Sequence, residues 1–411
     1  MKWTTLPTHR AWLLAQAGDL LDFFQAGSIN PLGGFFDLDD RGRPLPADAS
    51  SGAPRARYIH ATTRMVHCFA IAHLMGRPGA DAIIDHGMDF LWSAHRDAAN
   101  GGYFWAAGDQ APADDTKQAY GHAFVLLAAA SAKVAGHPNA DRLLTDVGTV
   151  IKERFWERSH GAAAEEFTRD WQKFSHYRGQ NSNMHLAEAC MAAFEATVDR
   201  VWLEMAESIA TMLIASITAN NGWRLPEHFD EHWNIDREYS GSPVFRPYGT
   251  TPGHWLEWSR LLVQMWELGD RRHGWLPDAS RTLFRRAVAE GWDAERGGFY
   301  YTLDWDGRPH RRDRYWWPCM EGIGAAAVLN AIDGDPFFEH WYRRIWNWSA
   351  THLLDREHGG WRPQLDDMLM PTSGPFYGKP DIYHALQACL IPLLPASGSI
   401  TRGLSTSGLQ V

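Results

Sequence analysis

One pattern of residues recurs six times along this chain of 411 residues. Each copy begins with an amphipathic segment whose apolar residues are spaced three and four apart, the period of an α-helix with one buried face. A segment rich in small and apolar residues follows, and its lack of a polar side indicates a helix buried all round. The amphipathic segments span residues 12–24, 81–93, 141–154, 201–217, 278–289 and 336–354; the small-residue segments span 61–72, 120–132, 183–193, 252–265, 318–331 and 381–390.

Polar residues at matching positions of the small-residue segments measure the repeat. They are His122, His185, His254, Glu321 and His384, with steps of 63, 69, 67 and 63 residues. Six such helix pairs predict an all-α fold, the (α/α)6 barrel, with amphipathic helices in an outer ring and small-residue helices in an inner ring. An open α-solenoid and two separate helical bundles are the alternatives. A closed ring is favoured because the sixth small-residue segment is as apolar as the middle ones.

Residues 1–395 are expected to form a single catalytic domain. Near-identical Gly-Gly-aromatic sequences at 101–103, 297–299 and 359–361 predict short β-hairpin loops. The loops at 33–57 and 220–249 are long, and the second is too aromatic for a linker, so we expect it to be a lid or a pocket wall. Its residues include Trp223, His228, Trp233, Arg246 and Tyr248. The Ser- and Gly-rich tail, 396–411, is expected to be disordered.

Composition narrows the class of protein. The net charge is −10 and no basic stripe occurs, which argues against a nucleic-acid partner. No apolar run approaches the roughly 18 residues of a membrane span, and the first residues lack the apolar core of a signal peptide. We therefore expect a soluble, cytoplasmic protein without a membrane partner. Four isolated cysteines in apolar segments are expected to be reduced core residues. The 21 Trp residues favour sugar binding, because flat rings stack on the C–H faces of sugars.

The polar residues of the inner helices point to chemistry. In a closed barrel the starts of all six inner helices converge on one end of the central cavity. Four of them carry His122, His185, His254 and His384, a fifth carries Glu321, and the first offers Arg64. A glutamate follows two of the histidines three residues later, at Glu188 and Glu257, where it can orient the imidazole and raise its basicity.

Several reaction classes could use such a cluster. A metal site is disfavoured because no histidine of this cluster has a second histidine four residues away or a cysteine paired with it. No Gly-x-Ser-x-Gly sequence is present for a nucleophile. Glycoside hydrolysis needs two facing carboxylates, for which Glu257, Glu321 and Asp381 are candidates, but it does not need several histidines. General acid–base chemistry on a sugar fits best, and aldose–ketose isomerisation uses it without any cofactor. A non-catalytic sugar- or protein-binding barrel is a further alternative.

Six short sequences together are similar to the N-acylglucosamine 2-epimerase superfamily, and to its aldose–ketose isomerase branch in particular. The resemblance covers the chain up to about residue 395. These sequences are Thr62-Thr63-Arg64-Met65, Tyr120-Gly121-His122, Asn183-Met184-His185, Pro252-Gly253-His254-Trp255-Leu256-Glu257-Trp258, Trp317-Pro318-x-x-Glu321 and Asp381-Ile382-Tyr383-His384.

The resemblance implies a metal-independent proton transfer through an enediol. It implies that His384 is the base that moves a proton between C2 and C1, and that His254 opens the sugar ring and shuttles protons among oxygens. Glu257 and Glu321 would support these histidines. The sugar site would be lined by Arg64, Tyr120, Asn183, His185, Arg246, Trp317 and Gln364. His122 shares the repeat position, but the resemblance implies no role for it.

The expected substrate is a monosaccharide, with D-mannose and D-fructose as the first choice and D-lyxose and D-xylulose as a second pair. A 2-epimerase of the mannose/glucose type and a sulfoquinovose isomerase are the alternatives. Sulfosugar-isomerising members have Gln directly before the Asp-Ile-Tyr-His sequence, where this chain has Pro380. A proline side chain donates no hydrogen bond, which disfavours a sulfonate, although the neighbouring Lys379 could meet an anion. The protein is expected to be a monomer or a homo-oligomer. Outer helices of such a barrel can pair into dimers, but no feature of the sequence selects between these states.

Overall fold

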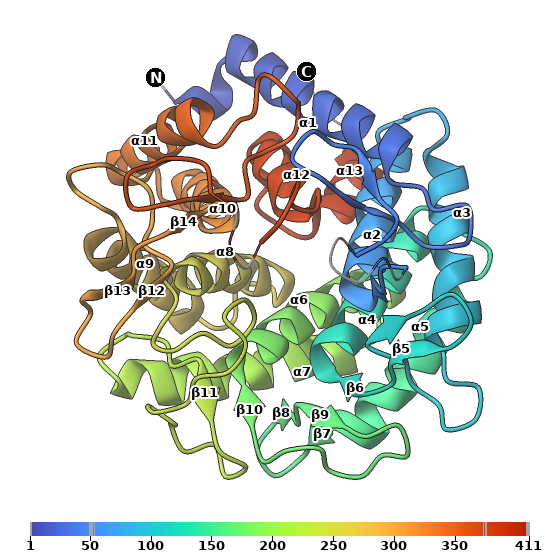
Figure 1. Ribbon diagram of the computed structural model, residues 1–411. Helices are drawn as coiled ribbons and strands as arrows, with labels where there is room; N and C mark the ends of the chain where they lie inside the picture. The colour runs from blue at the N-terminus through green and yellow to red at the C-terminus, as the bar shows by residue number, and fades with distance from the viewer. Residues whose placement is uncertain (1, 49–51, 53, 373, 375, 408–411) are drawn as a thin grey trace.

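Twelve helices form two concentric rings in the computed structural model, which describes residues 2–48, 52, 54–372, 374 and 376–407 (Figure 1). The outer ring consists of α1 (Pro7–Gly27), α3 (Ala80–Phe90), α5 (Ala140–Val150), α7 (Arg200–Ala210), α9 (Trp275–Arg286) and α11 (Pro336–His352). The inner ring consists of α2 (Ile59–Leu74), α4 (Ala119–Val134), α6 (Gln180–Thr197), α8 (Pro252–Leu268), α10 (Trp316–Asp333) and α12 (Tyr383–Leu390). The predicted (α/α)6 barrel is therefore confirmed.

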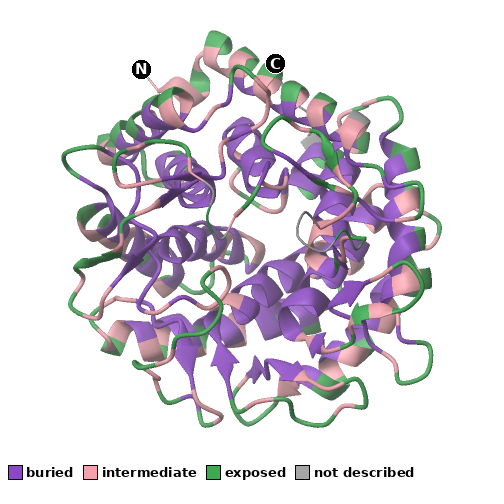
Figure 2. Ribbon diagram, viewed as in Figure 1, coloured by how far each residue is buried: buried purple, intermediate pink, exposed green. Residues whose placement is uncertain are grey.

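The two kinds of helix are buried as their sequences predict. Ala128, Ala129 and Ala132 of α4 are fully buried, and such small side chains let an inner helix pack against neighbours on all sides. The outer helices keep one exposed face (Figure 2). α12 packs against α10 on one side and α2 on the other, which closes the ring and rules out an open solenoid.

Four outer helices end in wider, π-type turns before the chain crosses to the inner ring. These turns span Leu91–His95, Ile151–Phe155, Thr211–Thr218 and Ala287–Gly291, and short 3-10 turns occur at Trp3–Thr5 and Ile391–Leu393. The continuous helix at Arg200–Thr218 is apolar and long enough to cross a membrane by length and composition alone. Half of its most apolar window is buried inside the barrel, so it reads as an outer helix of the ring.

Short strands join neighbouring loops at the end of the barrel where the inner helices begin. β3 pairs with β4, β6 with β9, β10 with β11, and β14 with β15, all antiparallel. The strands are β1 (Asp37–Leu38), β2 (Pro44–Leu45), β3 (Arg57–Tyr58), β4 (Ala106–Ala107), β5 (Pro112–Asp114), β6 (Lys117–Gln118), β7 (Trp156–Glu157), β8 (Ala162–Ala163), β9 (Glu166–Phe167), β10 (Arg178–Gly179), β11 (His228–Phe229), β12 (Thr302–Leu303), β13 (Pro309–Arg311), β14 (Arg314–Tyr315) and β15 (Gln364–Leu365).

A carboxylate–cation pair fastens four of these loops. In each loop the carboxylate follows an outer helix and the cation stands two to four residues before the next inner helix. The cations are nearly or fully buried, and such pairs are costly to break because one charge would remain unpaired. The pairs are Asp97–Lys117 at 3.0 Å, Glu157–Arg178 at 2.6 Å, Asp355–Lys379 at 2.5 Å, and Asp293–Arg314.

The end of the chain differs from the sequence prediction of a disordered tail. Residues Ile400–Ser407 form a helix, α13, that packs against α2 and α4. Ile400 and Leu404 lie one turn apart and are both buried, so this short polar segment has one apolar side. The carboxylate of Glu195 accepts the backbone N–H of Ser399 at 3.0 Å and holds the approach to this helix. Residues 408–411 lie outside the described part of the chain.

Candidate active site

His254 stands in the first turn of α8 and is held by a glutamate from another part of the chain. Its Nδ1 lies 2.9 Å from Oε2 of Glu227, just before β11, and 2.9 Å from the amide nitrogen of Gln180. The indole of Trp258 donates to the amide oxygen of Gln180, which turns the amide nitrogen toward Glu227. Burial opposes ionisation of Glu227, but His254 outweighs it and lowers the pKa of the carboxyl group. Nδ1 therefore donates to a carboxylate and leaves Nε2 as the basic nitrogen.

His384 repeats this arrangement at the start of α12. Its Nδ1 lies 2.8 Å from Oε1 of Glu321, on α10. The other oxygen of Glu321 accepts a hydrogen bond of 3.0 Å from Nε of Arg260. Burial opposes the charge of Glu321, yet Arg260 and His384 together lower the pKa of its carboxyl group. The predicted support of His384 by Glu321 agrees with this geometry.

Trp317 lies against both imidazoles. Its ring centre is 5.0 Å from that of His254 and 5.8 Å from that of His384, and all three side chains line one inner pocket. The indole fits against α8 only because residue 253 is glycine, since a Cβ there would come within 2.4 Å of the ring. Two carboxylate-backed histidines thus line one pocket, and both lie against the same aromatic ring.

Arg64, Tyr120 and His185 complete the wall of the inner pocket. Arg64 donates to Asp381 at 2.6 Å and to the Tyr120 hydroxyl at 2.9 Å. Burial raises the pKa of Tyr120 to about 12, so its hydroxyl keeps its proton at neutral pH. Burial also lowers the pKa of His185 to about 4, which keeps that ring uncharged. These groups offer hydrogen-bond donors and acceptors to a polar, uncharged ligand.

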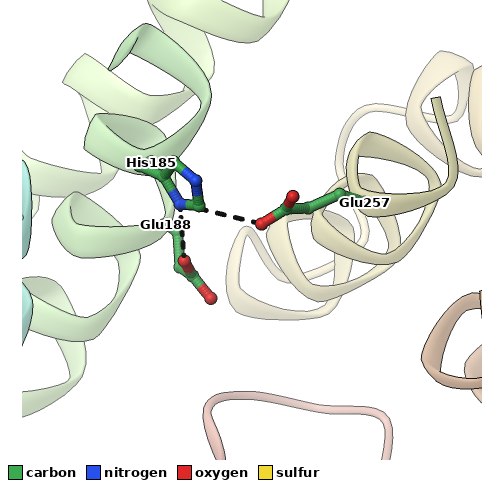
Figure 3. A group of neighbouring side chains, drawn as sticks. All are labelled: His185, Glu188 and Glu257. Carbon is green, nitrogen blue, oxygen red and sulfur yellow. Dashed lines mark hydrogen bonds and ion pairs between the residues drawn. The ribbon is translucent and has the colours of Figure 1, made fainter. Parts of the chain in front are cut away.

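Glu257 does not hold His254, although the sequence spacing predicted that it would. Its carboxyl oxygen lies 3.7 Å from Nδ1 of His185 (Figure 3). The same oxygen lies 3.8 Å from Arg260. Neither oxygen has a hydrogen-bond partner among the described residues, and the side chain lines the inner pocket. Burial, followed by the charges of Glu321 and Glu188, raises the pKa of Glu257 well above its usual range. Burial therefore favours the uncharged acid form of Glu257.

His185, Glu188 and Glu257 lie close enough to be considered as metal ligands, because their ligand atoms all fall within 4.8 Å of one another (Figure 3). The donor set fits a metal poorly. The guanidinium of Arg260 is 3.4 Å from Glu188 and 3.8 Å from Glu257, so a cation already stands beside both carboxyl groups. These contacts support the prediction that the reaction uses no metal, and that prediction remains to be tested.

Two residues expected near the sugar lie elsewhere. The Asn183 side chain bonds the backbone of Ala163 and Gly179 and is absent from the pocket wall, whereas Asn181 lines it. Gln364 packs against the Gly374 backbone behind the wall, next to Pro363, which does line the cavity.

His122 bonds the backbone of Tyr103 and Gln118, which explains why a position matching the repeat has no place at the site.

Above the inner pocket, a chamber of about 610 Å³ opens to solvent. The loop at 220–249 supplies part of its wall through Phe245 and Arg246, as predicted for a pocket wall. His60 and Trp105 stack with ring centres 5.2 Å apart, and both rings lie against Phe245.

Each cation of this chamber is paired with a carboxylate. The pairs are Arg55–Asp37 at 3.1 Å, Arg64–Asp381 at 2.6 Å, Arg246–Glu166 at 2.9 Å and Lys379–Asp355 at 2.5 Å.

Sequence reasoning missed Glu227, Gln180 and Arg260. Glu227 and Gln180 carried no signal, because neither belongs to the repeating positions. Arg260 did carry one: it is a charged residue inside an apolar helix, three residues after Glu257 and six after His254. Such spacing places all three on the same helix face.

Two carboxylate-backed imidazoles in a barrel cavity define an acid–base enzyme that acts on a polar small molecule. The chain belongs to the N-acylglucosamine 2-epimerase (GlcNAc 2-epimerase) family, whose sequence model matches residues 33–388. It is 45% identical to a D-mannose isomerase of Thermobifida fusca over 99% of both chains. It is 42% identical to a D-mannose isomerase of Pseudomonas cannabina pv. alisalensis, over 98% of this chain and 97% of that protein. A crystal structure of a D-mannose isomerase superposes with a TM-score of 0.86 at 30% identity, covering 95% of this chain and 99% of the other.

Proposed function

We propose that this protein is an aldose–ketose isomerase that interconverts D-mannose and D-fructose. Full-length relatives at 45% and 42% identity are D-mannose isomerases, which supports this substrate pair. The single observation that carries the reaction is the pair of imidazoles, each backed by a glutamate, that line one pocket next to Trp317. D-Lyxose shares the configuration of D-mannose at C2 to C4, so D-lyxose and D-xylulose form a second substrate pair.

The mechanism uses the free Nε2 atom of each histidine. His254 moves the anomeric hydroxyl proton to the ring oxygen, and the ring opens. Nε2 of His384 then takes the proton from C2 of the open-chain aldose and leaves the ionised form of a cis-enediol, with its negative charge on O1. His254 moves the hydroxyl proton of O2 to O1, and Nε2 of His384, whose proton exchanges with solvent, protonates C1 to leave the ketose. Glu321 and Glu227 stabilise each imidazolium as it forms, and no metal or redox cofactor takes part.

An uncharged sugar suits the chamber better than a sugar phosphate or sulfonate. Among the described residues of its wall, each of the four cations already has a carboxylate partner. Lys379 is also nearly buried, so it is a poor candidate for meeting an anionic substituent. An anionic group would have to leave water without gaining an unpaired cation, which is unfavourable.

The test is incubation of the purified protein with D-mannose in D2O, followed by NMR. We expect D-fructose with deuterium at C1, and the same rate after exhaustive dialysis against a chelator. Formation of D-glucose without D-fructose would identify a 2-epimerase instead, because an epimerase returns the proton to C2. No change in the sugar at any pH between 6 and 9 would contradict both functions.

A further inference from the structure

Arg260 lies on the face of α8 that carries His254 and Glu257, one turn further into the barrel. Its side chain is almost fully buried, and it is not part of the inner pocket wall. A buried arginine that does not meet the ligand has to be explained by its protein partners, since burying an unpaired charge is very costly.

Three glutamates from three different helices surround this guanidinium. Nε donates to Glu321 at 3.0 Å, and Nη2 donates to Glu188 at 3.4 Å. Glu257 is 3.8 Å from Nη2 and receives no hydrogen bond from it. Glu188 also accepts a hydrogen bond from the hydroxyl of Tyr383, and Glu321 meets His384. One cation thus lies beside three buried carboxyl groups but donates hydrogen bonds to only two of them.

Among the other titratable groups around the cluster, Arg64 is a second cation that acts on Glu257, but it lowers the pKa of Glu257 less than Arg260 does. His185 and His67 are both buried, and burial lowers the pKa of each to about 4. Arg64 is committed to Asp381. The hydroxyls of Tyr120 and Tyr383 stay protonated, because burial raises the pKa of both. A low-dielectric site with one guanidinium cannot hold three adjacent carboxylates, so one of them retains its proton.

We propose that Arg260 is a positioning residue that divides the three buried glutamates into two carboxylates and one uncharged acid. The two that accept its N–H groups, Glu321 and Glu188, are the carboxylates, and Glu257, which lines the pocket, is the acid. This proposal rests on the proposed isomerase function, because it explains how His384 meets a charged Glu321 while Glu257 presents a proton donor to the sugar.

The charge of Glu321 matters when His384 takes a proton from the sugar. The imidazolium then forms with its Nδ1–H directed at a carboxylate, which stabilises it. Without Arg260, Glu321 and Glu188 would be two adjacent buried carboxylates with no shared cation. Glu321 would then bind a proton at a higher pH, and the imidazolium would face a neutral acid.

Four variants test this division of charge in the full-length enzyme, with D-mannose as the substrate. R260M should lower kcat about 10²-fold, leave KM within about 3-fold, and move the acid limb of the kcat–pH profile to higher pH. R260M/E188Q should regain at least about tenfold in kcat over R260M, because one competing carboxylate is removed. R260K should lie between R260M and the parent. R57M is the matched control, since Arg57 is a buried arginine with a carboxylate partner, Asp109, outside the pocket; its kcat should be unchanged.

An unshifted profile in R260M, or a double variant no faster than R260M, would overturn the proposal. A second measurement does not depend on the folding of R260M. Burial also raises the pKa of Glu195 to about 7, so the infrared spectrum of E257Q is subtracted from that of the parent. The difference at pH 7 should show the C=O stretch of a buried, protonated carboxylic acid. Absence of this band from the difference spectrum would overturn the proposal, whether or not D-mannose proves to be the substrate.

Discussion

Oε2 of Glu227 lies 2.9 Å from Nδ1 of His254, although 27 residues separate them in the chain. The contact joins the segment before β11 to the first turn of α8, and it fixes which nitrogen of His254 faces the sugar. It also makes His254 an equivalent of His384, whose Nδ1 meets Glu321. Both halves of the proposed reaction therefore depend on a carboxylate behind an imidazole.

Glu227→Gln removes the charge behind His254 while keeping the shape of the side chain. We expect kcat for D-mannose to fall about 10²-fold, because the imidazolium of His254 loses its stabilising carboxylate. The exposed Glu153→Gln serves as the control for loss of a glutamate charge. Steady-state kinetics by a coupled D-fructose assay measure the effect, and a parent-like kcat in Glu227→Gln would remove His254 from its proposed role.

His384→Ala should end the exchange of the C2 proton of D-mannose with solvent, whereas ring opening, followed by anomer exchange in NMR, should continue. His122→Ala provides the contrast. It loses bonds to the backbone of Tyr103 and Gln118, and a buried group left unpaired costs about 1–3 kcal/mol of stability. We expect a lower Tm and an unchanged kcat for His122→Ala. Continued C2 exchange in His384→Ala would show that another base does this work.

The stability of the fold should decrease as the pH falls from 6.5 to about 4. Burial lowers the pKa of five histidines from the ordinary value of 6.5, to about 3 for His60 and to about 4 for the others, which are His67, His95, His122 and His185. In this pH window the unfolded chain binds protons that the folded chain does not.

Each such histidine therefore weakens the fold by up to about 1.4 kcal/mol per pH unit as the pH decreases. Chemical unfolding at a series of pH values measures this slope. A free energy of unfolding that stays constant between pH 6.5 and 4.5 would contradict the expectation.

Charged sugars should be poor substrates. We expect kcat/KM for D-mannose 6-phosphate to be at least about 10²-fold below that for D-mannose, because the phosphate finds no unpaired cation in the described chamber wall. Glu166→Gln should narrow this gap, since Arg246 would keep only Glu165, at 3.5 Å. Competition kinetics with both sugars give the ratio directly, and equal efficiency in the parent enzyme would refute the argument from charge pairing.

The ring could be predicted from the sequence because its cause is periodic. Equivalent positions of the inner helices recur every 63 to 69 residues, and this period predicts the number of helix pairs. The spacing of apolar residues predicts which ring each helix joins. The rotation of each helix about its own axis was harder to predict from the sequence. Asn183 and Asn181 both stand in the first turn of α6, and residues two apart on a helix point to nearly opposite sides. Only the three-dimensional structure shows that Asn181 faces the pocket.

Contacts made by loops were beyond sequence reasoning for a different reason. Glu227 reaches His254 through the path of an irregular segment, which no periodicity encodes. For Glu257 the sequence predicted a contact that does not form. Its spacing of three residues from His254 is suitable for an ion pair, but Glu227 from the loop already occupies Nδ1 of His254. The α13 helix was missed because it has only eight residues and is rich in Ser and Thr, and such short polar segments are typical of disordered tails.

The carboxylate–cation pairs at the bases of four loops have a consequence for how such barrels diversify. Each pair joins the beginning and the end of one loop, whatever the sequence at the tip of that loop. The pairs are Asp97–Lys117, Glu157–Arg178, Asp293–Arg314 and Asp355–Lys379. Loop tips can then change in length and sequence without disturbing the histidines below. The ring can then keep the positions of the catalytic histidines, while changes in the loops alter which substrates enter the pocket.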